Sequence, residues 1–306
     1  MTTTWTHQFI ITNQNAGQSI KQTLKMWLLP QRIRGALRIK KNYLVNGNEV
    51  PTSYELQIND KLILRFDQED FRTSESHYPP NGAQRVVIVF ESEDFVIVNK
   101  PVGMKMHPHS LTENDTLLNY LAADFSERRL VSAGVAARPY MVHRLDRETS
   151  GAVIVAKNPI IVPILNRMLA DKKIKRTYLA WVNGKMTGNS GTINAPIGVD
   201  LDDDRKRMVN GNDEQLAITH WTQVHTVFQK TLLRLQLETG RMHQIRVHLA
   251  AIGHPIIGDS LYGSTMGTVR MMLHATSIEL TIPFGGDTKI VSVPVPSDFP
   301  RQLSIQ

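Results

Sequence analysis

The chain has no cysteine among its 306 residues. This absence excludes disulfide bonds, cysteine-based zinc sites, iron–sulfur clusters and thiol nucleophiles. Long apolar runs are absent too, because stretches such as 86–90 and 160–165 are far shorter than the roughly 18 to 20 residues that a membrane-spanning helix needs. The first twenty residues hold no Lys or Arg, so the basic start of a secretion signal is missing. We therefore expect a cytoplasmic protein with no membrane partner.

Motifs of several common enzyme classes are also missing. The sequence contains no phosphate-binding loop ending in Gly-Lys-Ser/Thr, no dinucleotide glycine fingerprint, no Gly-x-Ser-x-Gly and no His-Glu-x-x-His. Eleven histidines leave a metal-dependent nucleic-acid hydrolase open as an alternative. However, His243 and His248 would lie about 140° apart on a helix of 3.6 residues per turn. The acidic run 202–204 precedes three basic residues, which favours a solvated turn. We predict no metal.

Positive charge is concentrated in one segment. The chain has 35 basic and 28 acidic side chains, a net charge of +7. Residues 17–66 carry nine basic and three acidic side chains, which amounts to +6 of that total. Such a concentration indicates a surface for a polyanion, with a solvated basic face as an equally weighted alternative.

The basic segment has a pattern of its own. Apolar residues at helical spacing over 20–28 predict a helix that ends before Pro30. A second short helix follows, with its cations on one face. Asn46-Gly47 between apolar residues predicts a hairpin, and 56–66 predicts a further strand pair. We therefore expect a small α+β domain over residues 17–66.

A polar stretch divides the chain. Residues 67–84 are predicted to be a linker, with residues 1–16 as an N-terminal extension and residues 85–306 as the larger domain. β-branched runs in the larger domain predict strands, and two segments have helical patterns. The expected strands are 86–90, 95–98, 152–156, 177–182 and 232–238, and the expected helices are 160–170 and 242–252. The expected fold class is α+β.

One turn-rich segment, His143–Gly151, leads directly into an apolar strand. Within it, Asp146 stands between Arg144 and Arg147, an arrangement that is by itself most often a structural ion pair. The presence of other polar motifs in the chain makes a functional role for Asp146 the better interpretation. These are Lys175–Tyr178 at a strand start, Thr239–Arg246 running into a helix, and the turn residues Gly253–Asp259.

Together these segments resemble the RluA-type family of RNA pseudouridine synthases. Two further segments, Val98–Gly103 and Leu273–Ala275, also match, and all of them occur in the family's order over roughly residues 85–300. The resemblance implies a pseudouridine synthase fold with a mixed, mainly antiparallel sheet. It also implies an isomerase that breaks the bond between ribose and N1 of uridine, turns the base and rejoins it through C5. Nothing is added or removed, so no cofactor is expected.

The resemblance assigns roles to residues of the larger domain. Asp146 is the implied catalytic carboxylate and Arg246 its guanidinium partner. Tyr178 is the implied aromatic ring that stacks on uracil and the route by which the C5 proton is removed. Arg144 is expected to enter the space left by the flipped base or to contact phosphate. Leu273 is expected to pack beside the base, and Arg241 to bind phosphate or support its loop.

The basic segment resembles an S4 RNA-binding domain, which often precedes this catalytic domain. Where the usual opening is Arg-Leu-Asp-Lys, this chain has Gln18-Ser19-Ile20-Lys21. The expected RNA contacts are Lys21, Lys25, Arg32, Arg34, Arg38, Lys40 and Lys41. We expect ribosomal RNA of the large subunit as the partner and a monomer as the default state. A non-catalytic RNA-binding factor of the same fold remains the alternative.

Overall fold

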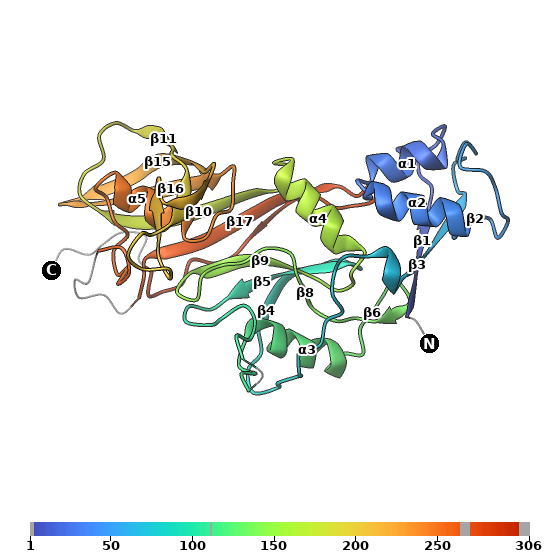
Figure 1. Ribbon diagram of the computed structural model, residues 1–306, viewed down its shortest axis with the longest axis horizontal. Coiled ribbons are helices and arrows are strands. Elements are labelled where there is room, and N and C mark those ends of the chain that lie inside the picture. The colour runs from blue at the N-terminus through green and yellow to red at the C-terminus, as the bar shows by residue number, and fades with distance from the viewer. Residues whose placement is uncertain (1–2, 111, 264–269, 300–306) are drawn as a thin grey trace.

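The structure is a computed structural model that describes residues 3–110, 112–263 and 270–299. The molecule is elongated, with a small domain at one end and a large sheet that extends to the other (Figure 1). Helix α4 (Ile161–Ala170) lies between these two ends, and α3 (Leu117–Glu127) covers the opposite side of the sheet (Figure 1). No helix in the described ranges combines the length and apolar character needed to span a bilayer.

The small domain contains a three-stranded antiparallel sheet and two helices. Its strands are β1 (Thr4–Ile10), β2 (Tyr43–Val45) and β3 (Lys61–Asp67), in the order β1-β3-β2. Helices α1 (Ile20–Met26) and α2 (Gln31–Lys40) pack on it through their apolar residues. Ser19 begins α1 with a capping box, in which Ser19 Oγ accepts from Gln22 N and Gln22 Oε1 accepts from Ser19 N.

Three expectations for this domain need correction. Strand β1 pairs with β3 from Thr4 to Ile10, so the predicted N-terminal extension over residues 1–16 contributes a strand to the sheet. The Asn46-Gly47 turn forms, but only the bridge between Val45 and Asn48 closes it, and the partner of β2 is β3. The range 56–66 likewise holds one strand rather than a pair: residues 56–60 are loop and turn, β3 begins at Lys61, and β1 takes the place of the second strand.

The large sheet has ten strands in the described part of the chain, in the order β11-β15-β16-β10-β17-β9-β5-β4, with β18 beside β17 and β8 beside β9. All its pairings are antiparallel except that of β17 with β9. The strands are β4 (Val87–Glu91), β5 (Phe95–Lys100), β8 (Tyr140–Met141), β9 (Ser150–Ala156), β10 (Lys175–Asn183), β11 (Ser190–Asn194), β15 (Ile218–Val227), β16 (Lys230–Leu237), β17 (Leu273–Thr281) and β18 (Thr288–Ser292). The predicted α+β class with a mainly antiparallel sheet is confirmed.

Smaller elements complete the fold. Helix α5 (Gln244–Ala251) follows β16 and packs beside a three-stranded sheet of β12 (Ile197–Val199), β13 (Arg207–Val209) and β14 (Asn212–Gln215). Strands β6 (Val131–Ser132) and β7 (Val135–Ala136) form a short hairpin, and η1 (Gln68–Asp70) is a short 3-10 turn after β3. Residues 71–86, the main part of the predicted linker, contain no helix or strand.

The hydrophobic core continues from the small domain into the large one. Phe95 and Ile154 of the sheet share a cluster of buried side chains with Leu24 and Trp27 of the small domain, while Val96 and Val153 face α3 instead. Thr6 N also donates to Ala133 O at 2.8 Å, which ties β1 to the β6–β7 hairpin. The small domain is therefore docked on the large one through a shared core.

The single parallel pairing in the described sheet positions the segment that contains Asp146. His274 and Ala275 of β17 pair with Ser150 and Gly151 of β9. Gly151 has φ of 115°, and a Cβ there would lie 2.1 Å from Ala275 O, so a side chain is excluded at this crossing. The close contact brings the loop before β9, which contains Asp146, beside the start of β17.

Candidate active site

A cavity of about 630 Å³ opens where the loop before β9 meets the loop between β16 and α5. All six residues predicted to be catalytic or substrate-binding line it, although they come from four separate segments of the chain. These residues are Arg144, Asp146, Tyr178, Arg241, Arg246 and Leu273. The structure therefore brings together in one hollow the side chains that the motifs selected.

Asp146 and Arg246 contact each other inside the cavity. Arg246 Nη1 donates to Asp146 Oδ2 at 3.2 Å, and the Asp146 side chain keeps 20% of its surface exposed. On its other edge, Arg246 donates through Nε and Nη2 to both carboxylate oxygens of the fully buried Asp259, each at 2.8 Å. Such a bidentate pair fixes the plane of the guanidinium. One edge of Arg246 is thus anchored while the other orients Asp146.

The charge of Arg246 is secure despite its burial. Burial alone lowers the pKa of a guanidinium, but the hydrogen bonds and charges of Asp259 and Asp146 outweigh it, and the pKa of Arg246 is raised. The Arg246 guanidinium also lies over the ring of Tyr262, 5.1 Å from its centroid. A permanent positive charge therefore stands beside the Asp146 carboxylate.

His243 stands on the other side of Asp146. Its Nε2 lies 4.0 Å from Asp146 Oδ1, beyond hydrogen-bond distance, and its Nδ1 lies 2.8 Å from the Tyr262 hydroxyl. That hydroxyl accepts from Arg207 N at 2.9 Å, so its own proton is free to be donated to His243 Nδ1. Burial is the main cause of a lowered pKa for His243. The arrangement favours a neutral ring whose Nε2–H faces the cavity.

Tyr178 and Leu273 form the apolar part of the cavity. Tyr178 lies on β10, where a bulge shifts its register against β17 at Thr177, and only 4% of its surface is exposed. Burial raises the pKa of Tyr178, and the nearby charge of Asp146 adds to the effect, whereas Arg176 opposes it. Leu273, at the start of β17, is equally buried. Together they offer a flat ring and an aliphatic surface beside the carboxylate.

A buried lysine holds the loop that contains Asp146 in place. Lys100 Nζ donates to the carbonyl oxygens of Pro101, Met104 and Arg147 at 2.8 to 3.1 Å, and Gly103 N donates to Arg147 O as well. Burial lowers the pKa of Lys100 to about 7. The lysine joins the loop after β5 to the loop that contains Asp146, and both loops line or adjoin the segments that matched in the sequence.

Three arginines surround the cavity. Arg144 and Arg241 are exposed, and Arg241 Nε donates to Leu216 O at 2.9 Å. Arg176 is half-buried and donates to Thr239 O at 3.3 Å. Arg176 belongs to the Lys175–Tyr178 motif, but the sequence analysis assigned it no role of its own. The rim is therefore rich in guanidinium groups, which suit phosphate oxygens.

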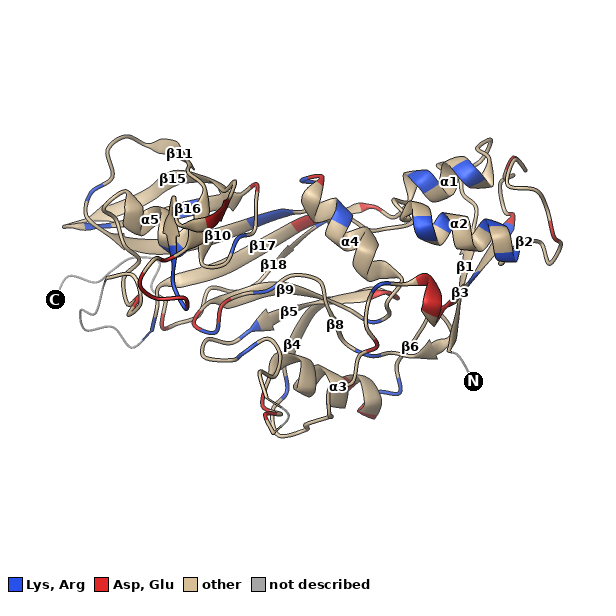
Figure 2. Ribbon diagram, in the orientation of Figure 1, with Lys and Arg blue, Asp and Glu red and all other residues tan. Residues whose placement is uncertain are grey.

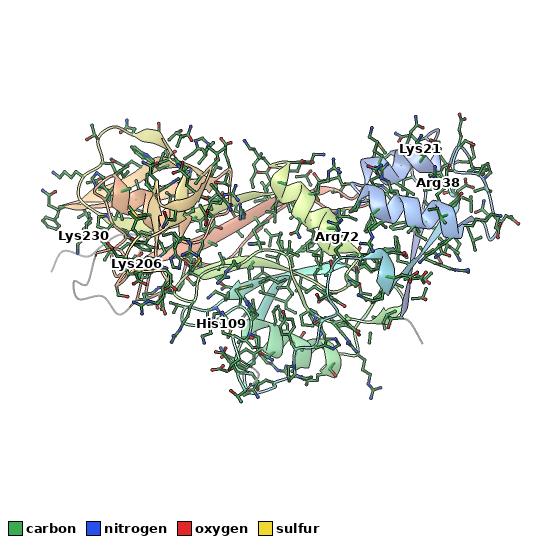
Figure 3. The ribbon with its side chains drawn as sticks, in the orientation of Figure 1. Lys21, Arg38, Arg72, His109, Lys206 and Lys230 are labelled. Atoms are coloured by element: carbon green, nitrogen blue, oxygen red, sulfur yellow. The ribbon has the colours of Figure 1, made fainter. Side chains whose placement is uncertain are left out.

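The basic residues of the small domain are not equally available. Lys21, Lys25 and Arg38 are exposed on α1 and α2. Figure 2 shows the basic positions of both helices in blue, and Figure 3 labels Lys21 and Arg38. Arg34 is half-buried and donates to Leu29 O, and Arg32 donates to Glu69 O. The first three side chains have no hydrogen bond or ion pair in the described part of the chain, whereas Arg32 and Arg34 each already use one guanidinium N–H on a backbone carbonyl.

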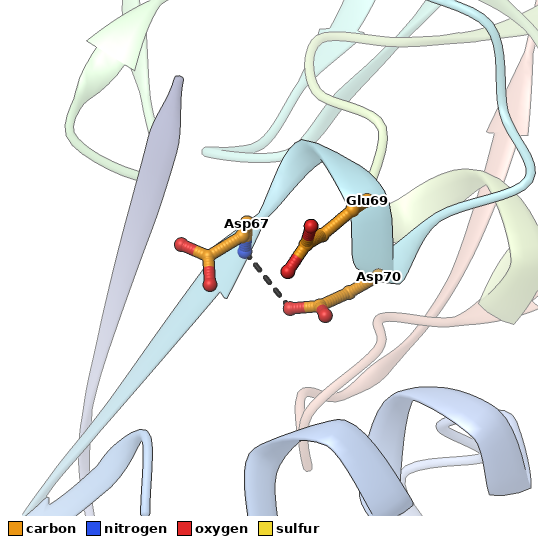
Figure 4. A group of neighbouring side chains, drawn as sticks. All are labelled: Asp67, Glu69 and Asp70. Carbon is orange, nitrogen blue, oxygen red and sulfur yellow. Dashed lines mark hydrogen bonds between the residues drawn. The ribbon is translucent and has the colours of Figure 1, made fainter. Parts of the chain in front are cut away.

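Lys40 is neutralised by an acidic cluster. Asp67, Glu69 and Asp70 converge at the end of β3, where Asp70 Oδ2 accepts from Asp67 N at 2.9 Å (Figure 4). Lys40 Nζ donates to all three carboxylates at 2.5 to 2.9 Å, and these hydrogen bonds raise the pKa of Lys40. Lys41 similarly pairs with Glu49 at 3.2 Å. The structure therefore argues against the expectation that Lys40 binds RNA phosphate.

Comparisons with known proteins agree with this geometry. Residues 94–251 match the family described as RNA pseudouridylate synthase, and residues 7–62 match the RluD ribosomal pseudouridine synthase N-terminal domain. The uncharacterized RNA pseudouridine synthase YhcT of Bacillus subtilis is 34% identical over 259 residues, which cover 83% of this chain and 84% of the relative. This chain belongs to the RNA pseudouridine synthase family.

Other matches support the same family. Ribosomal large subunit pseudouridine synthase D of Nitrosomonas europaea is 39% identical over 226 residues, which cover 71% of this chain and 64% of that protein. The solved structure of human RNA pseudouridylate synthase domain containing 1 aligns with a TM-score of 0.57 and 27% identity, covering 71% of this chain and 86% of that one. The sequence resemblance is confirmed, and the activity is the isomerisation of uridine to pseudouridine in RNA.

Some residues of this pseudouridine synthase site were not selected from the sequence. His243 and Asp259 lie within matched motifs. However, the sequence analysis weighed His243 only as a metal ligand and assigned no role to Asp259. Tyr262 lies three residues beyond the Gly253–Asp259 motif, and a single tyrosine in a loop carries no signal of its contacts. As expected from their spacing, His248 does not share the position of His243. Both ring nitrogens of His248 are hydrogen-bonded away from the cavity, Nδ1 to the Thr219 hydroxyl and Nε2 to Ala195 O.

Proposed function

We propose that Asp146 is the catalytic carboxylate of this pseudouridine synthase. The observation that carries the proposal is the Asp146–Arg246–Asp259 chain at the cavity, in which one buried guanidinium is shared by a partly exposed and a fully buried carboxylate. The reaction breaks the N1–C1′ bond of uridine, and C5 replaces N1 as the atom bonded to C1′. A carboxylate attacks an electrophilic carbon of the nucleotide and is released again: from C1′ it is displaced as C5 bonds to that carbon, and from C6 it is eliminated after the new bond has formed.

Tyr178 has two roles in this proposal. Its buried ring supplies the face on which uracil stacks, since bases and phenol rings favour such contact. The raised pKa of Tyr178 keeps its hydroxyl protonated at neutral pH. The hydroxyl therefore relays the C5 proton by giving up one proton as it accepts another, rather than acting as an anionic base.

The remaining cavity residues bind the flipped nucleotide. Leu273 packs against the edge of the base, and Arg144, exposed at the rim, enters the space that the base leaves or contacts a neighbouring phosphate. Arg241 binds phosphate from the opposite side of the opening. In the small domain, we assign RNA contacts to Lys21, Lys25 and Arg38. Lys40 is no longer assigned as an RNA contact.

We infer that the substrate is ribosomal RNA of the large subunit and that the enzyme acts in the cytoplasm as a monomer. The inference draws on relatives named ribosomal large subunit pseudouridine synthase D and on the RluD-type N-terminal domain. Pseudouridine mapping of total RNA from cells with and without the gene tests it. Loss of one or a few sites in large-subunit RNA, restored by the wild-type gene and not by Asp146→Asn, is the expected result. Loss confined to transfer RNA would contradict the substrate assignment.

A further inference from the structure

A second hollow of about 600 Å³ lies where the small domain meets the large one. Its walls come from the end of α1 at Met26–Leu28, from one side of α4, and from the turn between β17 and β18 at Ile282–Gly285. We call this hollow the interdomain groove. No role in catalysis or in the proposed S4-like contacts has been given to it above.

Helix α4 separates the groove from the active cavity. Leu169 and Ala170, at the end of α4, line the cavity, whereas Met168 and Lys172 line the groove. The α4 helix crosses the middle of the molecule in Figure 1, between the small domain and the end of the sheet that contains α5. An extended nucleic-acid chain that leaves the cavity over the last turn of α4 thus enters the groove directly.

The groove carries positive charge. Lys172, Lys173 and Lys175 line it together with one acidic residue, Glu279. Lys175 pairs with Glu279 at 2.8 Å and Lys172 pairs with Glu238, but the exposed Lys173 side chain has no ion pair or hydrogen bond among the described residues. A net positive rim next to the active cavity complements a phosphate backbone.

The apolar wall of the groove has three unusual features. Trp27 is 5% exposed, and its indole N–H has no hydrogen-bond partner in the part of the chain that the structure describes. Phe284 meets it edge to face, with ring centroids 5.4 Å apart. Leu28 and Phe284 both adopt positive φ, at 61° and 67°, a backbone conformation that is costly for bulky residues. Backbone strain of this kind recurs at ligand sites, and the half-buried Phe284 lines the groove at one of these two strained positions.

We propose that the interdomain groove binds the single-stranded RNA that flanks the target uridine. Lys173 contacts a phosphate, and a base lies against Phe284 and the exposed side chain of Met26, while the small domain binds the RNA further along. The proposal rests on the proposed function, because it takes the RNA in the active cavity as its starting point.

Binding of two RNA lengths tests the groove. Full-length enzyme is titrated with fluorescein-labelled single-stranded oligouridylates, one of about five nucleotides and one of about twenty, since site sizes of single-strand binding modules fall between these lengths. Lys173→Glu is expected to weaken binding of the long probe roughly threefold to tenfold and that of the short probe less than twofold. Lys230→Glu, an exposed lysine at the far end of the molecule (Figure 3), is the matched control and is expected to change neither.

Cross-linking gives a second readout. The long probe is prepared with 4-thiouridine, irradiated with the enzyme and mapped by mass spectrometry. Adducts in Met26–Leu28 or Ile282–Gly285 are expected. Equal weakening of both probes by Lys173→Glu, weakening by the control as well, or adducts absent from both segments would overturn the proposal. So would an RNA-free dimer that Lys173→Glu dissociates, because the groove would then belong to a second copy of the chain.

The two proposals fail in different ways. An enzyme that binds the probes in this length-dependent manner but forms no pseudouridine would overturn the proposed function. If Lys173→Glu has normal turnover and binds the long probe as tightly as the wild-type enzyme does, only the proposal about the groove is overturned.

Discussion

The active cavity and the small basic domain are both proposed to contact RNA, but they hold their charges differently. In the cavity, Arg246 is 6% exposed and is held by a bidentate contact, so its geometry is fixed before any substrate arrives. On the small domain, Lys21, Lys25 and Arg38 extend into solvent. Chemistry needs atoms placed to within a fraction of an ångström, whereas backbone binding needs only charge at roughly the right place.

Breaking the buried pair should have the largest effect of the variants that probe this comparison. Arg246→Ala leaves the buried Asp259 carboxylate without its counter-charge, with only the backbone N–H groups of Leu261 and Tyr262 as donors, which costs about 3 to 5 kcal/mol of unfolding free energy. It also removes the donor that orients Asp146, so turnover should fall roughly a hundredfold or more. Urea unfolding and single-turnover assays measure the two effects. Arg234→Ala, an exposed arginine on β16, is the control. Full stability in Arg246→Ala would show that the pair is not the anchor.

The His243–Tyr262 contact sharpens the account of the cavity. His243→Asn removes the ring whose Nε2 lies 4.0 Å from Asp146, and turnover should fall roughly tenfold to a hundredfold through misplaced substrate. Tyr262→Phe keeps the ring but removes the hydroxyl that contacts Nδ1, so it should give a smaller loss and shift the pH profile of kcat. His77→Asn, at an exposed histidine, should change neither quantity. Identical pH profiles for wild type and Tyr262→Phe would contradict the hydrogen-bond assignment.

The small domain should respond in affinity rather than in turnover. Replacing Lys21, Lys25 and Arg38 together by Gln should reduce the slope of log affinity against log salt by about 2, because each contact with single-stranded RNA contributes about 0.7. Replacing Lys185, Lys230 and Arg234, which are exposed elsewhere, should leave the slope as it is. Lys40→Gln should also leave the slope as it is, because its charge is already matched by three carboxylates. A slope that falls with Lys40→Gln would show that this lysine does contact phosphate.

The docking of the small domain should depend weakly on pH. His7 Nε2 lies 2.9 Å from Asp94 Oδ1 in a buried contact between β1 and the large domain. Burial lowers the pKa of His7, but the hydrogen bond and charge of Asp94 outweigh it, so the pKa is raised above 6.5. The stability that this pair contributes is therefore present below pH 6.5 and is lost as the pH rises through the raised pKa.

Unfolding free energies measured from pH 5 to pH 9 test this pair. His7→Asn should reduce the fall in stability across that interval, whereas His77→Asn should leave it unchanged. A His7→Asn variant with the same pH dependence as the wild type would show that another group is responsible.

The sequence predicts the cavity better than it predicts the small domain, for physical reasons. Asp146, Tyr178 and Arg246 lie in short motifs, and a site that performs chemistry constrains many neighbouring residues at once. Strand β1 escaped prediction because its burial alternates over only a few residues and includes a buried histidine. The pairing of Lys40 with acids 27 to 30 residues later depends on how β3 ends beside α2, which no local pattern encodes. Tyr262 lies outside every motif for the same reason.

The most direct test of the central claim is tritium release from RNA labelled at C5 of uridine by Asp146→Asn, measured alongside RNA affinity and thermal unfolding. The carboxamide keeps the size of the side chain but removes the charge beside Arg246. The account predicts less than a few per cent of wild-type release, with near wild-type affinity and fold. Substantial release by a folded Asp146→Asn enzyme would contradict it.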